Sequence, residues 1–385
     1  MTTSALTARV IMLNSRLRGG GTDTQCLALA QGLTEQGWEV LTAGPDSAPL
    51  SAEAPALQAL PRFRPLQVAA LAGLLRRSRA RIVHAHHGDD YWTALLAAQL
   101  AQTRPKVVFS RHLAKSPRAA ISRRHLFARA DAIIAVSDFV RRVLAEGHRD
   151  PASPVPERHF RPPCFLDPRK IHVIHTGIDT RRFFPRDRAF TEAARRTLGL
   201  KPGETAFGVV GGFDLPVGKG QRIFLRAARE VMRRLPKSSF LLAGTGSMEA
   251  TLEEDIHHHG LAGRARLLGQ QPDPVALHHA LDILVHPQIA TEAFPSVVLE
   301  AHACGRPVIA SRLDGIPEAW APGALGHLVP PGDAGELAAT MVGQAEHPSP
   351  TEAERTAAHA RVAAEASLPV QARKVGDLYR RLMAR

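Results

Sequence analysis

Continuous apolar runs alternate along the chain with longer segments in which apolar residues recur every three or four positions. The runs 9–14, 106–110 and 283–286 are examples, and their continuity is typical of strands buried on both faces. The segment 24–36 shows the second pattern, which predicts an amphipathic helix. Strands and helices in alternation predict an α/β fold with parallel sheets and right-handed crossovers.

The same pattern extends over both halves of the chain. The strands that it predicts are 9–14, 38–43, 81–84, 106–110, 131–136 and 171–175 in the first half, and 207–210, 239–243, 283–286 and 307–311 in the second. With 385 residues, of which 44% are hydrophobic, two domains are the natural expectation. Residues 150–169 carry six prolines, so no regular structure is expected there.

Cysteine usage and hydropathy indicate the compartment. Three cysteines, widely separated and without metal-ligand spacing, indicate a reducing environment and no disulfide framework. The apolar run 68–75 is too short to span a bilayer, and the first eight residues lack the features of a signal peptide. We therefore expect a soluble, cytoplasmic protein.

The formal net charge of +13 is concentrated in the first half of the chain. Residues 1–180 hold 24 Lys and Arg against 14 Asp and Glu, whereas the remainder holds 25 against 22. A basic half attracts nucleic acid, an anionic membrane or a phosphorylated substrate. Nucleic-acid binding ranks last, because only 5% of the residues are aromatic and stacking platforms need exposed aromatic side chains.

Two segments suggest sites for an anionic ligand that carries hydroxyl groups. Glycines at 19–21 separate a strand from a helix, which suits a phosphate-cradling loop, although a plain tight turn has the same spacing. Glu292 precedes a helix that should begin at Pro295, and Glu300 should lie about two turns inside it. Carboxylates there can accept hydrogen bonds from sugar hydroxyls; the alternative is two ordinary surface glutamates.

Residues 292–318 resemble a known family. Glu292, seven intervening residues and Glu300 are followed by Ala-Cys-Gly-Arg-Pro-Val-Ile-Ala-Ser (303–311) and Gly-Ile-Pro-Glu (315–318). This combination resembles the donor site of retaining glycosyltransferases of family four, of the lipopolysaccharide-core type. The resemblance implies the GT-B fold, an α/β architecture of two Rossmann-like domains with parallel sheets facing across a cleft.

The resemblance also implies the domain boundaries. His175–Pro185 resembles the family's crossover segment, with Thr176 in place of the usual Asn. We expect an acceptor-binding domain at 1–180 with the Pro-rich insertion 150–169, and a domain for the nucleotide-sugar at 181–368. Residues 369–385 should form a helix that crosses back to the first domain.

Site residues follow from the same resemblance. Glu292 and His112, the latter in Ser-Arg-His (110–112), should orient the transferred sugar, and Glu300 should bind the ribose hydroxyls. Lys219 should neutralise the diphosphate, but Gly212 stands where the family commonly has an Arg, for which Arg222 or an arginine of the first half could substitute. The full set of donor-binding residues implied is Gly20, Gly21, Lys219, Gly244, Gly246, Gln270, Phe294, Pro295, Ser296, Val297 and Glu300.

A basic, partly apolar helix is expected at 115–130, and it suggests an acceptor or membrane contact. The residues concerned are Lys115, Arg118, Arg123, Arg124 and Arg129. They favour an anionic saccharide or lipid-linked saccharide, such as lipopolysaccharide core, on the inner face of the membrane. The alternative is a solvated helix coated with arginines. The nearby His84–Asp90 segment is interpreted as lining the cleft, not as a metal site.

The reaction implied by the resemblance is transfer of a sugar from a nucleotide-sugar, on family frequency a UDP-sugar, with retention at the anomeric carbon. It needs no enzymic nucleophile, cofactor or metal, because positioning and electrostatics carry the catalysis. A nucleotide-sugar epimerase or hydrolase of the same fold is the alternative, and Asp89 or Asp90 could supply the further carboxylate that it requires.

Overall fold

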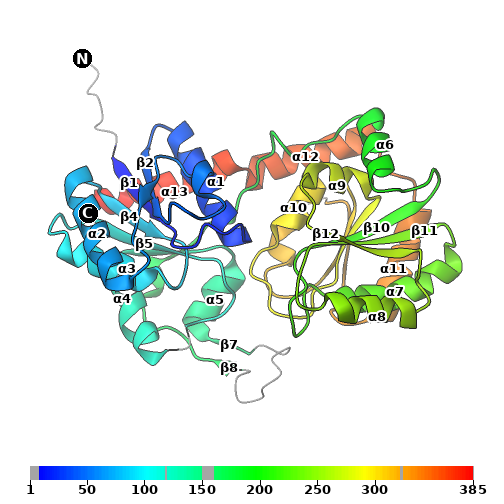
Figure 1. Cartoon of the computed structure of the whole chain (residues 1–385), viewed down its shortest axis with the longest axis horizontal. Helices are drawn as coiled ribbons and strands as arrows, with labels where there is room; N and C mark the ends of the chain where they lie inside the picture. The colour runs from blue at the N-terminus through cyan, green and yellow to red at the C-terminus, as the bar shows by residue number, and fades with distance from the viewer. Residues whose placement is uncertain (1–7, 118, 150–159, 321–323, 385) are drawn as a thin grey trace. The chain divides into compact units, whose positions relative to one another are not determined.

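The computed structural model describes residues 8–117, 119–149, 160–320 and 324–384 (Figure 1). The chain divides into two compact units. Among the described residues, unit 1 comprises 8–149, 160–177 and 366–384 apart from position 118, and unit 2 comprises 178–365 apart from 321–323. No helix in this described part of the chain is both long and apolar enough to span a bilayer.

Unit 1 is built on a seven-stranded parallel sheet with the strand order β3-β2-β1-β4-β5-β6-β9. Its strands are β1 (Arg9–Leu13), β2 (Glu39–Gly44), β3 (Gln58–Ala59), β4 (Ile82–Ala85), β5 (Lys106–Arg111), β6 (Ala132–Ala135) and β9 (Ile171–Val173). Its helices are α1 (Gly21–Glu35), η1 (Ser51–Glu53), α2 (Arg64–Ser78), α3 (Tyr91–Leu100), the π-helical turn η2 (Ser122–Leu126), α4 (Phe127–Arg129), α5 (Asp138–Glu146), η4 (Pro168–Lys170) and α13 (Leu368–Met383).

The last helix, α13, packs into the core of unit 1 although it is remote in sequence. It lies alongside α1, as Figure 1 shows in red beside blue. The apolar face of α13 contributes Val375 and Tyr379 to the cluster formed by β1 and α1. Trp38 and Tyr379 meet edge to face with ring centroids 5.4 Å apart, a favoured aromatic geometry. Unit 1 is therefore completed by the end of the chain.

Unit 2 contains a six-stranded parallel sheet with the order β12-β11-β10-β13-β14-β15. The strands are β10 (Thr205–Val210), β11 (Ser238–Ala243), β12 (Ala265–Gly269), β13 (Ile283–His286), β14 (Val308–Ser311) and β15 (Gly326–Val329). The helices are α6 (Arg188–Thr197), α7 (Gln221–Arg234), α8 (Glu249–His258), α9 (Pro274–Ala280), α10 (Ser296–Ala303), η5 (Pro317–Ala319), α11 (Ala334–Glu346) and α12 (Glu352–Ala366). Phe207, Phe224 and Phe240 are fully buried at its core.

Two parallel sheets with helical crossovers confirm the predicted fold class, and the details correct three expectations. The first helix begins at Gly21 and not at Thr24, so Gly21 belongs to the helix and not to the loop before it. The short strand β3 was not expected in the loop after β2. Within the Pro-rich segment, 150–159 lie outside the described residues, but its flanks do contain regular structure. A two-residue antiparallel ladder pairs β7 (His148–Arg149) with β8 (Phe160–Arg161), and η4 follows.

Candidate functional site

The polar centre of unit 2 is a partly buried ion pair between Lys219 and Glu292. Lys219 lies in the loop before α7, and Glu292 lies in the loop between β13 and α10. The Lys219 Nζ is 2.5 Å from the Glu292 Oε2, and the His286 Nε2 at the end of β13 is 3.7 Å from the same oxygen. The Glu292 side chain is only 12% exposed and that of Lys219 is 33% exposed. Glu292 is therefore not an ordinary surface glutamate.

Glu292 is ionised at neutral pH. Burial acts to raise its pKa, but the neighbouring His286 ring and the Lys219 charge outweigh burial and lower the pKa to about 2. For His286 the effect of burial is opposite: it lowers the pKa of the imidazole, so the ring is neutral. The centre thus holds the Lys219 amino group in contact with an ionised carboxylate.

Backbone contacts fix the Glu292 loop. The Gly315 N–H donates to the Glu292 carbonyl at 3.1 Å, and the Glu292 N–H donates to the Asp314 carboxylate at 3.3 Å. Because Gly315 belongs to the Gly-Ile-Pro-Glu segment, the two halves of the family motif are joined by hydrogen bonds. The spacing of this motif along the sequence therefore has a structural basis.

The helix α10 begins without a side-chain cap. Pro295 is its N-cap residue and makes no side-chain cap hydrogen bond. Such a helix start favours an anion. Glu300 is the fifth residue of α10, so it lies about one turn inside and not two as expected. Its Oε2 is 3.3 Å from Nε2 of the fully buried His278, and its side chain is 20% exposed.

Two glycine-containing loops of unit 2 pack against each other backbone to backbone. Gly244 has φ +138°, and a Cβ there would lie 2.3 Å from the Gly211 carbonyl oxygen. A Cβ on Gly246 would lie 2.4 Å from the Phe213 carbonyl carbon, and the Phe213 N–H donates to the Thr245 carbonyl. Gly244 and Gly246 were predicted to approach the nucleotide. The structure gives them a packing role that requires glycine in any case.

The residues expected to bind phosphate around Lys219 differ in their surroundings. Arg222, considered as a substitute for the missing Arg, is paired with Asp255 through N–O distances of 2.6 and 3.2 Å. The buried Gln221 instead accepts a hydrogen bond from the Lys219 N–H at 2.7 Å. Gln270 follows β12 and is exposed. Lys219 is thus held by Gln221 and Glu292, and Arg222 is bound elsewhere.

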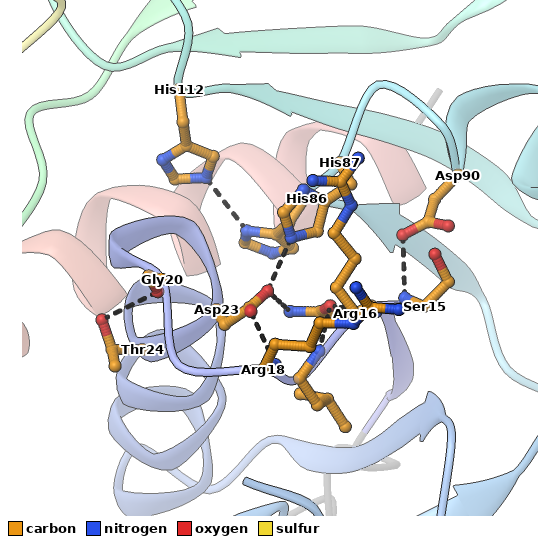
Figure 2. A network of polar contacts seen from close by, with 12 residues as sticks. Ser15, Arg16, Arg18, Gly20, Asp23, Thr24, His86, His87, Asp90 and His112 are labelled. Carbon is orange, nitrogen blue, oxygen red and sulfur yellow. Dashed lines mark hydrogen bonds and ion pairs between the residues drawn. The ribbon is translucent and has the colours of Figure 1, made fainter. Parts of the chain in front are cut away.

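In unit 1, Asp23 organises the glycine loop (Figure 2). Its carboxylate accepts the N–H groups of Arg18 and Gly19 at 2.8 and 3.2 Å, and it also contacts His87 Nε2 at 2.6 Å. Burial acts to raise the pKa of Asp23, but these contacts outweigh it and hold the pKa far below its usual range. A Cβ added to Gly20 or Gly21 would meet nothing within 4 Å. The loop is therefore rigid at its base and open beside these two glycines.

The histidines of this region have separate roles. His84 is fully buried, and its two ring nitrogens contact the Tyr379 hydroxyl at 2.6 Å and the Ser110 hydroxyl at 2.8 Å. The expectation that His84 lines a cleft is therefore wrong: it is part of the core. His86 is also buried, and its Nδ1 lies 3.2 Å from His112 Nε2. Burial lowers the pKa of His112 to about 3, so the pair is neutral.

The basic segment after His112 is only partly the helix that was expected. Helical residues begin at 120 and include the π-helical turn, while Lys115 precedes them and Arg118 lies outside the described residues. Arg123 donates to the Pro117 carbonyl at 2.9 Å, and the Arg124 guanidinium lies 5.3 Å from the centre of the Phe165 ring. Arg129 is in the last turn. Two of the arginines are thus used in local contacts.

Across the part of the chain that the structure describes, no three His, Cys, Asp or Glu side chains are grouped to hold a metal ion. The three cysteines are buried and free, and burial raises the pKa of each thiol, to about 11 for Cys164. The candidate functional groups are therefore the Lys219–Glu292 ion pair of unit 2 and the polar residues in the loops after the parallel strands.

Two family profiles match the chain, one in each half. The profile "Glycosyltransferase Family 4" matches residues 19–156, and the profile "Glycosyl transferases group 1" matches residues 204–346. A crystal structure of HepE from Anabaena, in complex with UDP and glucose, superposes with a TM-score of 0.77 over 96% of this chain and 99% of that chain, at 20% identity. The chain therefore has the GT-B fold, and each of its halves is similar to one of the two glycosyltransferase profiles.

Two curated relatives share the name D-inositol 3-phosphate glycosyltransferase. That of Mycobacterium sp. (strain KMS) is 37% identical over 182 residues, which cover 46% of this chain and 39% of the relative. That of Mycobacterium marinum is 30% identical over 305 residues, which cover 72% of this chain and 60% of the relative. The chain thus spans less than two thirds of the length of either relative.

The sequence did not predict the residues that support the polar centres of unit 2. Gln221, His278 and His286 contact Lys219, Glu300 and Glu292 respectively, and all three are buried. Of the three, only Gln221 could have been suspected from the sequence, because it follows Gly-Lys-Gly (218–220) directly. Nothing in the sequence pairs the two histidines with the glutamates, because β13 and α9 meet α10 only in the folded chain.

Proposed function

We propose that the protein transfers a sugar from a nucleotide-sugar, with retention at the anomeric carbon, to an acceptor that is a saccharide, a polyol or a lipid-linked saccharide. The observation that carries the proposal is the partly buried Lys219–Glu292 pair in unit 2. Both residues occupy the positions at which the family motif places donor-binding groups. The uncapped start of α10 follows Glu292 by only a few residues.

The donor is held by unit 2 in this proposal. Its diphosphate contacts Lys219 and the N–H groups at the start of α10, where the helix dipole favours negative charge. Glu300 accepts hydrogen bonds from the ribose hydroxyls, and His278 orients its carboxylate. A UDP-sugar is the first donor to test, because the structurally similar HepE was solved with UDP and glucose.

Catalysis in this proposal uses positioning and charge. Glu292 orients the sugar, and the leaving phosphate accepts the acceptor's proton on the same face. No metal ion or cofactor takes part. That His112 contacts the transferred sugar stays a prediction.

The alternative of an epimerase or hydrolase is less well supported. It needs a further carboxylate that is free to act, yet Asp89 is paired with Arg16 at 2.6 Å. Asp90 is buried and accepts the Ser15 N–H at 3.0 Å. Both candidates are therefore engaged in holding the loop after β1.

The acceptor is proposed to be anionic. Phosphorylated polyols are the first to test, since the curated relatives are named for D-inositol 3-phosphate. Lipopolysaccharide core is a second candidate. It is favoured by three apolar side chains, each 59% exposed, at and beside the basic segment: Leu113, Ile121 and Phe165. Apolar and basic residues together suit peripheral contact with an anionic membrane.

Thermal unfolding in the presence of UDP-, GDP- and ADP-glucose tests the donor assignment. One nucleotide-sugar should raise the melting temperature, by an amount that grows with the logarithm of its concentration once the dissociation constant is exceeded. The same donor with D-inositol 3-phosphate, and separately with a lipopolysaccharide core acceptor, should then yield a product whose anomeric configuration is read by NMR. Absence of stabilisation by all three donors would refute the proposal, and an inverted product would refute retention.

A further inference from the structure

A surface depression of about 750 Å³ lies at the carboxyl ends of neighbouring strands in unit 1. Its walls come from the loops after β1, β2, β3 and β4 and from the start of α2. The carboxyl ends of parallel strands are where α/β proteins bind ligands. The volume is in the range of small-molecule sites. The depression belongs wholly to unit 1, and Asp89 is the one lining residue that the sequence analysis had named as a candidate site residue.

Four arginines and one carboxylate line this depression. They are Arg16, Arg18, Arg62, Arg64 and Asp89. Arg16 and Arg64 share Asp89, at 2.6 and 3.6 Å, and Arg62 donates to the Ser47 hydroxyl at 3.2 Å. Within the described residues, the Arg18 guanidinium has no hydrogen-bond or ion-pair partner. Among the lining residues, one carboxylate faces four guanidinium groups, which is an excess of three positive charges. Asp23 and Asp90, which also act on Arg16, offset part of this excess.

The fold holds the first wall of the depression in place. The Arg16 N–H donates to the buried Asn14 Oδ1 at 3.0 Å, and the Ser15 N–H donates to the buried Asp90 carboxylate at 3.0 Å (Figure 2). On the opposite wall, an Arg64 N–H donates to the Asp89 carbonyl at 3.0 Å. The Arg16 hydrogen bond and charge lower the pKa of Asp89, which keeps its carboxylate ionised. The arginines are thus arranged before any ligand arrives.

We propose that this depression binds a phosphate monoester on the acceptor substrate, with Arg18 and Arg62 as its direct ligands and with Arg16 and Arg64 beside them. The inference rests on the proposed glycosyltransferase function. Guanidinium groups match the geometry of phosphate oxygens and can bind them in a bidentate manner. A phosphate monoester carries about 1.5 to 2 negative charges near pH 7, which balances most of the excess.

Gly20 and Gly21 lie two and three residues after Arg18, and a Cβ on either would meet no atom within 4 Å. The backbone beyond Arg18 is therefore open on this side, which leaves room for the polyol or sugar part of an acceptor in the proposal. The basic segment 115–129 lines no part of the depression. The phosphate site and the proposed membrane contact are consequently separable by mutation.

Binding to the intact protein, measured by calorimetry at low salt, tests the site without requiring turnover. Glucose 6-phosphate is the probe, glucose is its neutral counterpart, and UDP-glucose is titrated separately. The variant is R62A/R64A, which changes Arg64 at the start of α2 and Arg62 just before it. Its matched control is R76A/R77A, which removes two exposed arginines in the last turn of α2. R18K is a further variant, because lysine keeps the positive charge but lacks the planar guanidinium that can bind phosphate in a bidentate manner.

Glucose 6-phosphate should bind the wild type and the control equally, and glucose should not bind. R62A/R64A should weaken phosphate binding at least tenfold and leave UDP-glucose binding unchanged; R18K should weaken phosphate binding by a smaller factor. Vesicles with phosphatidic acid, compared with phosphatidylcholine alone, distinguish a lipid phosphate from a soluble one. If only these vesicles bind, and R62A/R64A abolishes this, the site is kept and its ligand is a lipid headgroup.

Equal phosphate affinity in R62A/R64A and in R76A/R77A would overturn the inference, as would failure of both glucose 6-phosphate and phosphatidic acid vesicles to bind. If these phosphates bind as expected but no nucleotide-sugar does, the site stands and the glycosyltransferase proposal fails instead. Circular dichroism of each variant shows that the fold is kept. R18K guards against a variant that fails to fold, since it changes one exposed side chain.

Discussion

The charged centres of the two units differ in how their charges are balanced. In unit 2, Lys219 meets Glu292 in a largely buried contact, so the site is neutral as a whole. In unit 1, four exposed arginines and a single carboxylate, Asp89, line the depression, so the charge of its lining residues is not balanced. A buried charge needs a partner within the protein, whereas an exposed charge is solvated by water until a ligand binds. The Lys219–Glu292 pair therefore also contributes to the structure of unit 2, whereas the arginines of unit 1 have no such role.

The glycines of the two units differ in the same way. Gly244 has a positive φ and lies against the Gly211 backbone, so the fold of unit 2 demands it. Gly21 of unit 1 has no neighbour within reach of a Cβ and lies in the first turn of α1. Packing explains the first glycine and leaves the second unexplained. In the proposed function, access for a ligand would be the reason for glycine at position 21.

The largest effect is expected from removal of the charge at Glu292. Glu292→Gln should lower kcat on the order of 100-fold or more, because a preorganised charge at the reacting centre is lost. The affinity for the donor should change far less, since Lys219 loses its competitor for the diphosphate. Steady-state kinetics together with calorimetric titration of UDP-glucose separate the two effects. An unchanged kcat in this variant would remove Glu292 from the proposed mechanism.

Acid should weaken the stability contribution of the same carboxylate. The pKa of Glu292 falls from 4.5 to about 2 on folding, so its ionised form contributes about 3 kcal/mol above pH 4.5. That contribution is lost as the pH falls from 4.5 towards 2. The difference in unfolding free energy between wild type and Glu292→Gln should therefore shrink across this window, as measured by urea denaturation at several pH values. A difference that is constant from pH 7 to pH 3 contradicts the ion pair.

The two glycines give a matched pair of stability measurements. Gly244→Ala should lower the free energy of unfolding by about 2 to 4 kcal/mol, from backbone strain and a clash with Gly211. Gly21→Ala should leave it unchanged or raise it by up to about 1 kcal/mol, because alanine favours the helix. Only Gly21→Ala should reduce activity without loss of stability. Full activity in a stable Gly21→Ala protein would mean that the space beside the loop is not used.

Much of the fold follows from the sequence because its signal is local. The continuous apolar runs 106–110 and 283–286 form β5 and β13 almost to the residue. Strand β3 has only two residues and is fixed by pairing with β2, so no local pattern reports it. The start of α1 was misplaced since glycine is a poor helix former, yet Gly21 tolerates the first turn.

The candidate sites were predictable only in part, for a similar reason. Motif spacing identifies Glu292 and Glu300, because the residues between them form one loop and one helix. The partners His286 and His278 come from other elements and carry no motif. Arg62 follows a strand that was not expected, so the sequence gives no reason to place it beside Arg18. The basic segment 115–130 was predicted as a site because its arginines are close together in sequence. Local charge density does not show which arginines from separate loops come together in the fold.

A moderate effect on donor binding is expected from Glu300. Glu300→Ala removes the carboxylate proposed to accept hydrogen bonds from the ribose, and it should raise the KM for the donor about tenfold, or about 1.4 kcal/mol. The value of kcat should change less, so the variant should show the reverse pattern to Glu292→Gln. His278→Ala is the companion variant, since His278 only orients Glu300. It should give a smaller change of KM in the same direction, and a loss of kcat in either variant would contradict the assignment.

The smallest effect is expected at Arg222, which lies close in sequence to Lys219 but has a different partner. Its bond to Asp255 is formed at a surface where its own side chain is 57% exposed, and such pairs contribute no more than about 1 kcal/mol. Arg222→Ala should therefore change the donor KM less than threefold, whereas Lys219→Ala should raise it at least tenfold. Asp255→Ala provides the matched control, because it frees Arg222 without moving it. If Arg222→Ala weakens donor binding as much as Lys219→Ala, Arg222 leaves Asp255 when the donor binds and supplies the guanidinium that Gly212 lacks.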